Sequence, residues 1–282
     1  MTKSPIPPRV AAVHDLSCLG RCALTAVIPV LSTLGSQAVP IPTALLSTQT
    51  DGFENLFFRG LDREMDEITA HFSSLSLSFD AIYSGFLGSV DQIERVIRII
   101  RQFPAPLVVV DPVMGDDGAL YQTFTPALVD GMKRLCGHAH LITPNYTEAC
   151  FLTDTPYRPT EEMSEEALAA LCRTLAEKLY ALGPRRVVIT GIVMGDRIRT
   201  VDFDGQTLST CDRPRLAARF PGTGDIFAAT LLGKMLSGKP FRRAVEEACA
   251  FVSHTIAYTL AAEGAPRREG VLLEGCLSAL RA

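Results

Sequence analysis

Short apolar runs rich in β-branched residues alternate with segments of helical periodicity along most of the chain. Several runs, such as LVVV and RVVIT, are apolar at nearly every position, which is typical of strands covered on both faces. The predicted strands are 9–13, 38–41, 81–84, 107–110, 140–143 and 186–190. Strand–helix alternation at this spacing predicts an α/β fold with a central, mostly parallel sheet and helices on both faces.

Two segments carry the apolar stripe of a helix. The first stripe consists of Ile93, Val96, Ile97 and Ile100, and its pattern ends before Pro104. The second consists of Leu168, Leu171, Leu175, Leu179 and Leu182. We expect Thr160 to cap the second helix, and Gly183 and Pro184 to end it.

The pattern changes in the C-terminal third. RIRTVDFDGQTLST alternates around Asp204 and Gly205 and predicts a β-hairpin, followed by helices over 226–237 and 241–262. The chain contains no repeat and no linker. We therefore expect a single domain over residues 1–282, in which residues 1–8 form a short, flexible, Pro-rich tail.

Composition narrows the class of protein. The 282 residues are 47% hydrophobic and 21% charged, and 27 Lys+Arg against 31 Asp+Glu give a net charge of −4. These values argue against disorder, and the lack of a basic stripe disfavours nucleic acid as a partner. No apolar run reaches the ~18 residues of a membrane span, and no secretory signal opens the chain. We expect a cytoplasmic protein with no membrane partner.

Eight cysteines are the one unusual count. Cys18 and Cys22 are too far from other Cys or His residues to complete a zinc site. We therefore interpret the cysteines as small apolar core residues in a reducing compartment. Cys18 and Cys22 alone fall near the candidate chemistry described next.

A glycine-rich turn, Pro221-Gly222-Thr223-Gly224-Asp225, runs into a predicted helix. Gly222 and Gly224 let the backbone approach a ligand, and the following helix N-terminus, with Thr223, would form an anion hole for phosphate oxygens. Asp225 would then accept the proton of a hydroxyl that attacks the phosphate. The alternative is that Asp225 only caps the helix.

Two further loops follow predicted strands. Asp111 comes directly after LVVV, where a carboxylate can bind Mg²⁺; the alternative is an Asx-turn before proline. Asn145 and Glu148 follow HLIT and share one helix face, from which both can reach a magnesium–phosphate cluster. The alternative is a capping box, and both arrangements can hold at once.

Together the three loops supply a metal-binding carboxylate, a magnesium and phosphate pair, and an anion hole with a base. Phosphoryl transfer needs this set. The chain has no G-x-x-x-x-G-K-[ST] motif, so it is not a P-loop enzyme.

The ordered motifs AAVHDLSCLGRC, PTALLSTQTDGF, YSGFLGS, DPVMGD, LITPNYTEA, VVITG and PGTGDIFAA span about residues 10–264. In this order they resemble the ribokinase superfamily and, within it, the pyridoxal (vitamin B6) kinases. The resemblance implies a single ribokinase-like domain that phosphorylates the 5′-hydroxymethyl group of pyridoxal, pyridoxamine or pyridoxine. It implies Mg²⁺ with ATP, a monovalent cation (K⁺) as a further candidate, and a homodimer.

The resemblance also implies roles for individual positions. Asp225 corresponds to the catalytic base, and Gly222, Thr223 and Gly224 correspond to the anion hole. The positions around Mg-ATP are Asp111, Asp116, Tyr121, Thr143, Asn145, Glu148, Thr190 and Gly191, with Asp111 and Glu148 as candidate metal ligands. The vitamer pocket consists of Asp15, Thr43, Ala44, Thr50 and Phe86.

The chain departs from the family pattern at three positions. Many members have Ser in place of Asp15, His in place of Gln49, and Tyr in place of Phe86. We hypothesise that Asp15 pairs with a protonated ring nitrogen, a stronger contact than a hydroxyl makes. The alternative is that Asp15 ends its strand and faces water. We interpret its neighbour His14 as a partly buried strand-end residue rather than a catalyst.

Three alternatives stay open. A hydroxymethylpyrimidine or sugar kinase would share the fold, although kinases of the former type with Cys in place of Asp225 match less well. A non-catalytic B6- or nucleotide-binding protein would have no need for Asp225 beside the anion hole. Residues 23–34 could form a dimer interface or a plain core helix, and Phe57 and Phe58 are expected in the core.

Overall fold

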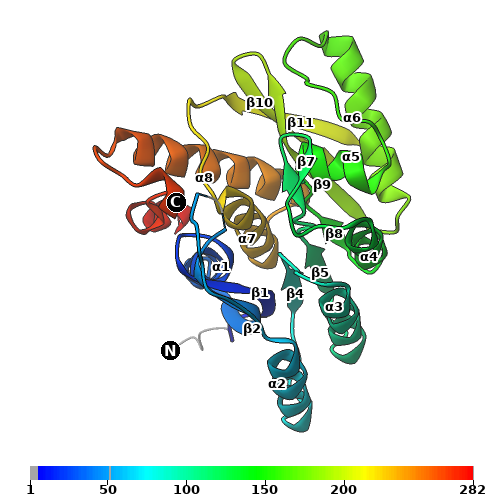
Figure 1. Cartoon of the computed structure of the whole chain (residues 1–282). Helices are drawn as coiled ribbons and strands as arrows, with labels where there is room; N and C mark the ends of the chain where they lie inside the picture. The colour runs from blue at the N-terminus through cyan, green and yellow to red at the C-terminus, as the bar shows by residue number, and fades with distance from the viewer. Residues whose placement is uncertain (1–5, 51, 282) are drawn as a thin grey trace, which may run out of the picture.

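The computed structural model describes residues 6–50 and 52–281 and contains one nine-stranded sheet with helices packed against it (Figure 1). Six strands are parallel: β1 (Arg9–Leu19), β2 (Gln37–Thr48), β4 (Ala81–Ser84), β5 (Leu107–Val110), β8 (Leu141–Ile142) and β9 (Arg186–Met194). Three antiparallel strands complete its edges: β3 (Phe58–Gly60), β10 (Arg197–Phe203) and β11 (Leu208–Pro214). The spatial order is β11-β10-β9-β8-β5-β4-β1-β2-β3. The predicted mostly parallel sheet is confirmed.

The helices form two layers. They are α1 (Ala23–Thr33), α2 (Asp62–Ser74), α3 (Val90–Gln102), α4 (Pro126–Cys136), α5 (Tyr146–Leu152), α6 (Glu165–Tyr180), α7 (Thr223–Leu236) and α8 (Phe241–Ala261). Three short 3₁₀ helices follow: η1 (Arg267–Glu269), η2 (Leu273–Gly275) and η3 (Leu277–Arg281). A small hairpin, β6 (Gly115–Asp116) and β7 (Ala119–Leu120), stands outside the main sheet.

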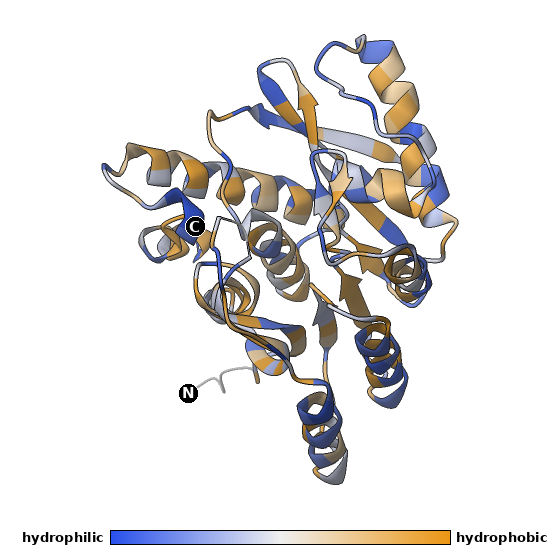
Figure 2. Ribbon diagram, viewed as in Figure 1, coloured by the Kyte–Doolittle hydropathy of each residue, from blue (hydrophilic) through white to orange (hydrophobic). Residues whose placement is uncertain are grey.

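Each face of the sheet has its own hydrophobic core. Val108 and Val110 of β5 belong to the core that α2 to α6 cover, whereas Val109 belongs to the core that α1, α7 and α8 cover. Successive side chains of a strand point to opposite faces, so a strand covered on both sides must be apolar at every position. Figure 2 shows this for β5, which is hydrophobic along its whole length.

The strands match the predictions in place and differ in length. β4 and β5 have the predicted bounds, whereas β1 continues past residue 13 to Leu19, with an irregular register between His14 and Leu16. This extension carries polar residues, so no apolar run marked it in the sequence. The hairpin of β10 and β11 is confirmed, and Asp204 accepts hydrogen bonds from the backbone N–H groups of residues 206 and 207 in its turn.

The predicted cap of α6 is wrong. Ser164, not Thr160, is the N-cap, and its hydroxyl oxygen accepts the Ala167 N–H. The Thr160 hydroxyl instead donates to the Val193 carbonyl at 2.6 Å, which ties the preceding loop to β9. The leucine stripe faces the core as predicted, although Leu182 lies beyond the end of the helix.

Two further expectations have clear outcomes. Phe57 and Phe58 are not in the core, because they lie at the edge strand β3 with 55% and 50% of their surface exposed. The segment over α1 is a core helix, with residues such as Val27 and Val30 fully buried against the sheet and α7. The interpretation as a core helix is thus confirmed for its buried face, while the dimer stays a prediction.

The interpretation of the cysteines as core residues is confirmed for seven of the eight and is wrong for Cys18. Cys18 is exposed, the other seven are buried, and all eight are free thiols. Among the residues described, no helix is both long and apolar enough to cross a bilayer. Residues 1–5 of the predicted tail lie outside the described residues, and residues 6–8 form neither helix nor strand.

The strand order reverses beside β1. β1 pairs with β2 on one side and with β4 on the other, after which the chain continues through β5, β8 and β9 away from β2. In open parallel sheets, ligands bind outside the carboxyl ends of the strands at such a reversal. The polar residues singled out from the sequence follow the carboxyl ends of these strands.

Candidate active site

The glycine-rich turn lies against the loop that follows β1. Gly222 is the N-cap of α7 and has a left-handed backbone, with φ +81°. A Cβ atom there would lie 2.0 Å from the Arg21 carbonyl oxygen, so only glycine fits. The helix begins at Thr223, three residues earlier than predicted, and its first N–H groups therefore lie within the turn.

The loop after β1 is held from the far end of the chain. The Arg21 N–H donates to the Glu269 carbonyl at 2.9 Å, and the Arg21 guanidinium pairs with Glu274 at 2.8 Å. Gly270 also lies so close that a Cβ atom would meet the Arg21 carbonyl oxygen at 3.1 Å. The wall behind the glycine-rich turn is thus built from η1, η2 and the segment between them.

Asp225 does not cap its own helix. Its Oδ2 accepts a hydrogen bond from the Ala23 N–H at 2.8 Å, at the start of α1, and only 15% of its side chain is exposed. Burial raises the pKa of Asp225 to about 7, and Asp15 adds to this effect while the Ala23 N–H opposes it. A carboxyl with a pKa near 7 is suited to accept a proton at neutral pH.

The residue that holds Asp225 has a strained backbone. Ala23 has φ +44°, a conformation that costs an L-residue of order 1–3 kcal/mol. It is buried at the first position of α1, directly after Cys22. This conformation places the Ala23 N–H on Asp225, and the sequence alone gave no signal of it.

His14 lies within β1 and not at its end, because the strand continues to Leu19, and its imidazole lies beside Asp225. It is fully buried, its Nδ1 lies 3.8 Å from the Asp225 Oδ1, and its ring packs edge-on against Tyr83. Burial lowers the pKa of His14 to about 3, so the imidazole is neutral near neutral pH. It therefore supplies no positive charge that would lower the pKa of Asp225.

Asp111 lies opposite the glycine-rich turn, at the end of β5. A Cβ atom on Gly224 would be 3.8 Å from the Asp111 Oδ2, and Asp111 itself is 5% exposed. Burial raises the pKa of Asp111 to about 8, with a further contribution from Asp225 and partial opposition from Thr143. Two carboxyls thus face the same small space from β5 and α7.

Asn145 and Glu148 form the capping box that was considered as the alternative. The Asn145 side chain accepts the Glu148 N–H at 2.9 Å, and the Glu148 Oε2 accepts the Asn145 N–H at 2.7 Å. They also hold the loop after β5, since the Glu148 Oε1 accepts the Met114 N–H and the Asn145 amide donates to the Gly115 carbonyl. Capping therefore coexists with a position beside Asp111.

The donor set fits Mg²⁺. Burial, and then the charge of Asp111, raise the pKa of Glu148, which means that the two carboxyls lie close enough to interact. Neither forms an ion pair with a Lys or Arg of the described residues. Mg²⁺ binds through one or two carboxylates and completes its shell with water and substrate phosphates. Within the described ranges, no group of three or more His, Cys, Asp or Glu side chains is arranged to hold a metal ion.

The remaining nucleotide-site candidates surround the same region. Thr190 forms a parallel bridge with Asn145, and Gly191 follows with a left-handed backbone at φ +76°. Asp116 lies on the β6–β7 hairpin, and Tyr121 comes directly after it with 45% of its surface exposed. Asp116, Asn145 and Gly191 line one cavity, so three predicted residues meet there.

Most of the residues predicted to line the vitamer pocket are buried. Asp15 is 6% exposed and accepts a hydrogen bond from the Ser17 hydroxyl at 2.8 Å, so the alternative that it faces water is wrong. The Thr43 hydroxyl donates to the Phe86 carbonyl at 3.4 Å, and Ala44 is buried beside it. Thr50 is exposed in the loop after β2.

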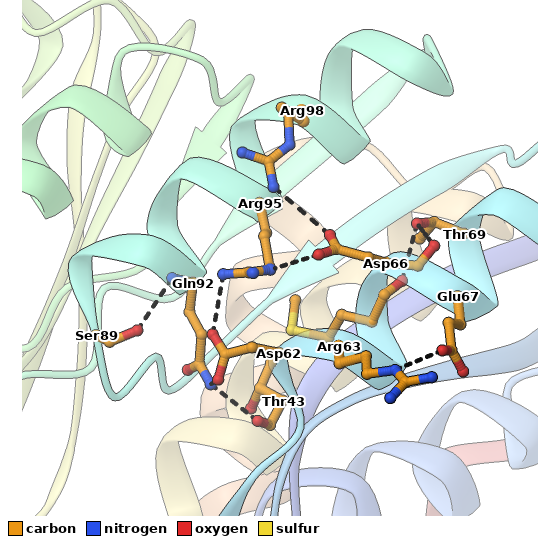
Figure 3. A network of polar contacts seen from close by, with 11 residues as sticks. Thr43, Asp62, Arg63, Asp66, Glu67, Thr69, Ser89, Gln92, Arg95 and Arg98 are labelled. Carbon is orange, nitrogen blue, oxygen red and sulfur yellow. Dashed lines mark hydrogen bonds and ion pairs between the residues drawn. The ribbon is translucent and has the colours of Figure 1, made fainter.

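A polar network holds the β2 end of this pocket in place (Figure 3). Gln92 of α3 is 3% exposed; its Nε2 donates to the Thr43 carbonyl at 2.9 Å, and its Oε1 accepts the Gly88 N–H at 2.9 Å. Arg95 pairs with Asp62 at 3.0 Å and with Asp66 at 3.1 Å, which links α3 to α2.

Replacing Gln92 with alanine should lower the free energy of unfolding by about 1–3 kcal/mol, because it takes the Gln92 partner from the Gly88 N–H and removes one of the two hydrogen bonds that the Thr43 carbonyl accepts, the other coming from the Leu61 N–H. Urea unfolding measures this difference. Gln102→Ala is the matched control, since Gln102 lies on the same helix and its side chain donates to the exposed Ser73 hydroxyl. Equal losses for the two variants would contradict the role given to Gln92.

Comparison with known proteins places these features in a family. The profile of the phosphomethylpyrimidine kinase family matches residues 11–266. A pyridoxine/pyridoxal/pyridoxamine kinase of Bordetella avium is 30% identical over 271 residues, which cover 91% of this chain and 87% of that protein. The thiamine biosynthetic bifunctional enzyme TH1 of Arabidopsis thaliana is 27% identical over 255 residues, 89% of this chain.

The chain spans about half the length of two of the curated relatives it matches: 47% of the Arabidopsis enzyme and 50% of a bifunctional thiamine biosynthesis protein of Geobacter sulfurreducens. Among solved structures, a Bacteroides thetaiotaomicron protein assigned to the phosphomethylpyrimidine kinases, crystallised with pyridoxal, superposes with a TM-score of 0.89. It is 38% identical, and the match covers 98% of this chain and 96% of that one.

Proposed function

Because the chain belongs to the phosphomethylpyrimidine kinase family, we propose that it transfers the γ-phosphoryl group of ATP to the 5′-hydroxymethyl group of a B6 vitamer. The acceptors would be pyridoxal, pyridoxamine and pyridoxine, and the reaction would serve B6 salvage. The observation that carries the proposal is the placement of the Asp225 carboxyl in the first turn of α7, opposite Asp111.

The roles follow from this placement. The hydroxymethyl oxygen attacks the γ-phosphorus, ADP leaves, and the hydroxyl proton passes to Asp225. The N–H groups of Gly222, Thr223 and Gly224 would stabilise the charge that develops on the transferred oxygens. Little base strength is needed because the transition state is loose, so a carboxyl with a pKa near 7 suffices.

Asp111 and Glu148 would hold Mg²⁺, which neutralises the phosphate charge when bound. Thr143, Asn145, Thr190 and Gly191 would line the phosphates, and Asp116 and Tyr121 would cover them from the β6–β7 side. The homodimer, the K⁺ requirement and the cytoplasmic location stay predictions that rest on the family resemblance and on composition.

Asp15 supports the choice of acceptor class. It is a buried carboxyl whose pKa is raised by burial, and it lies close enough to Asp225 to raise the pKa of that group. A protonated aromatic ring nitrogen would relieve the cost of this burial through a charge-assisted hydrogen bond. Pyridoxal has such a nitrogen, and the Bacteroides relative was crystallised with pyridoxal.

A hydroxymethylpyrimidine is the second candidate acceptor, because it also combines a ring nitrogen with a hydroxymethyl group. Relatives named for thiamine biosynthesis favour it. The two candidates differ only in the acceptor pocket around Asp15, Thr43 and Phe86, so the nucleotide side of the site does not separate them.

The deciding experiment measures ADP release from Mg-ATP with pyridoxal, pyridoxamine, pyridoxine, hydroxymethylpyrimidine, ribose or no acceptor. The proposal expects turnover with the B6 vitamers, with kcat/KM at least tenfold above that for hydroxymethylpyrimidine. The reverse ranking supports the second candidate, and turnover only with ribose supports a sugar kinase. Binding of ATP and pyridoxal without ADP release indicates a non-catalytic binding protein.

The pH dependence should report Asp225. The base acts only when deprotonated, and its pKa is raised to about 7, so kcat/KM for the acceptor should rise with pH and reach half its maximum near 7. Initial rates at saturating Mg-ATP from pH 5.5 to 9 test this. A flat profile over that range would contradict the assignment of a buried carboxyl with a raised pKa as the base.

A further inference from the structure

Arg219 joins two loops that are far apart in the sequence. It lies in the segment between β11 and the glycine-rich turn, and its guanidinium pairs with Asp116, at 3.6 Å, and with Asp117 of the β6–β7 hairpin. The Arg219 NH1 also donates a hydrogen bond to the Asp117 Oδ2. Asp117 lies at the tip of the hairpin and has a left-handed backbone, with φ +52°.

Beneath this contact lies the cavity that Asn145 and Gly191 line together with Asp116, Asp117 and Arg219. Its volume is about 40 Å³. That is room for a few water molecules, whereas pockets that hold a nucleotide-sized ligand measure roughly 300–1,000 Å³. Arg219, Asp116 and Asp117 thus all line a cavity that, with the ion pair in place, is too small for a phosphate chain.

The charges around the cavity are unequal. Its acidic side chains are Asp116, Asp117 and Glu161, and Arg219 is the single Lys or Arg among its described lining residues. A nucleotide triphosphate carries several negative charges and needs a cation in addition to Mg²⁺ where carboxylates surround it. Arginine suits this need because its planar fork binds two phosphate oxygens at once.

The pair is easy to exchange. The Arg219, Asp116 and Asp117 side chains are 58%, 57% and 66% exposed, respectively. Ion pairs this exposed contribute little to stability, because water screens the charges. A phosphate that enters the cavity can therefore replace Asp117 as the partner of Arg219 with little loss to the fold.

We propose that Arg219 is a nucleotide-binding residue that changes partner: it holds Asp117 across the cavity in the free protein and binds a phosphate of ATP in the complex. The inference rests on the proposed function, since it needs ATP as a substrate. It adds a cationic ligand, and a competing internal carboxylate, to the site described above.

Two variants have opposite expected effects. Arg219→Ala removes the cation and should weaken nucleotide binding about tenfold, the effect of losing a charged hydrogen bond. Asp117→Asn removes the competitor and leaves Arg219 available, so it should tighten binding two- to fivefold. A hairpin that needed the pair for its shape would show weaker binding in both variants.

The test is calorimetric titration of the full chain with Mg²⁺ and a non-hydrolysable ATP analogue, together with acceptor KM values. Arg63→Ala is the matched control. It removes the same charge from α2, where Arg63 pairs with Glu67, and should leave both quantities unchanged (Figure 3). Melting temperatures of all variants should stay within 2 °C of the wild type, and acceptor KM should stay within twofold.

The outcomes separate the two claims. Equal analogue binding by the wild type and Arg219→Ala overturns this inference alone, and so does weaker binding by Asp117→Asn. A wild-type protein that binds no analogue overturns the proposed function and, with it, the inference. Weaker binding by Arg219→Ala together with tighter binding by Asp117→Asn supports it.

Discussion

Replacing Asp225 with asparagine should lower kcat by about 10²–10⁴-fold, the usual contribution of a positioned general base. Asparagine keeps the size of the side chain and can still accept the Ala23 N–H, but it cannot take up the proton of the acceptor hydroxyl. Steady-state rates of ADP formation with saturating pyridoxal and Mg-ATP measure the loss. Binding of the ATP analogue should persist.

The same variant should not be less stable than the wild type. Burial raises the pKa of Asp225, which means that the charged carboxylate is costly in the folded state near neutral pH. An amide removes that cost, so the melting temperature should stay equal or increase. Asp130→Asn, on the exposed side of α4, is the control and should change neither kcat nor stability. Near-normal turnover of Asp225→Asn would show that another group is the base.

The second large effect is expected from Gly222→Ala. The new methyl group would lie 2.0 Å from the Arg21 carbonyl oxygen, and the φ of +81° is itself unfavourable for alanine. We expect a loss of about 3 kcal/mol or more in the free energy of unfolding, from the left-handed backbone and the steric clash together. Turnover should be abolished even at temperatures where the variant stays folded, because the glycine-rich turn cannot keep its shape.

Gly238→Ala separates the two causes. Gly238 has φ +88°, close to that of Gly222, but a Cβ atom there would meet nothing within 4 Å. It should therefore show only the backbone cost, about 1–2 kcal/mol, with full activity. Urea unfolding and turnover of both variants are the measurements. Equal destabilisation by the two substitutions would mean that the contact with Arg21 yields without cost.

The layer structure was predictable because it depends on local pattern. A run such as LVVV can be a strand only if both faces are covered, and β5 has the predicted bounds. The loops that carry Asp111, Asn145 and Asp225 follow from the same logic, since parallel strands bring their carboxyl ends to one edge. The capping box of Asn145 and Glu148 could also be predicted, because its two members are three residues apart.

The features that were not predicted, or were predicted wrongly, depend on contacts between residues far apart in the sequence. The Ala23 N–H that holds Asp225 comes from 202 residues away, and the burial of His14 depends on how far β1 extends. Phe57 and Phe58 have core-like side chains, but they fall on an edge strand with no element beyond it among the described residues, so they stay exposed. No local periodicity carries such information.

The contacts of Arg21 have a consequence for how the protein is made. Arg21, whose carbonyl lies behind Gly222, is held by Glu269 and Glu274, which come about 250 residues later in the chain. A nascent chain on the ribosome has β1 early but lacks these partners until residues 269–274 have been synthesised. The wall of the glycine-rich turn is therefore completed only after these residues have been synthesised, and a shorter nascent chain would lack this wall.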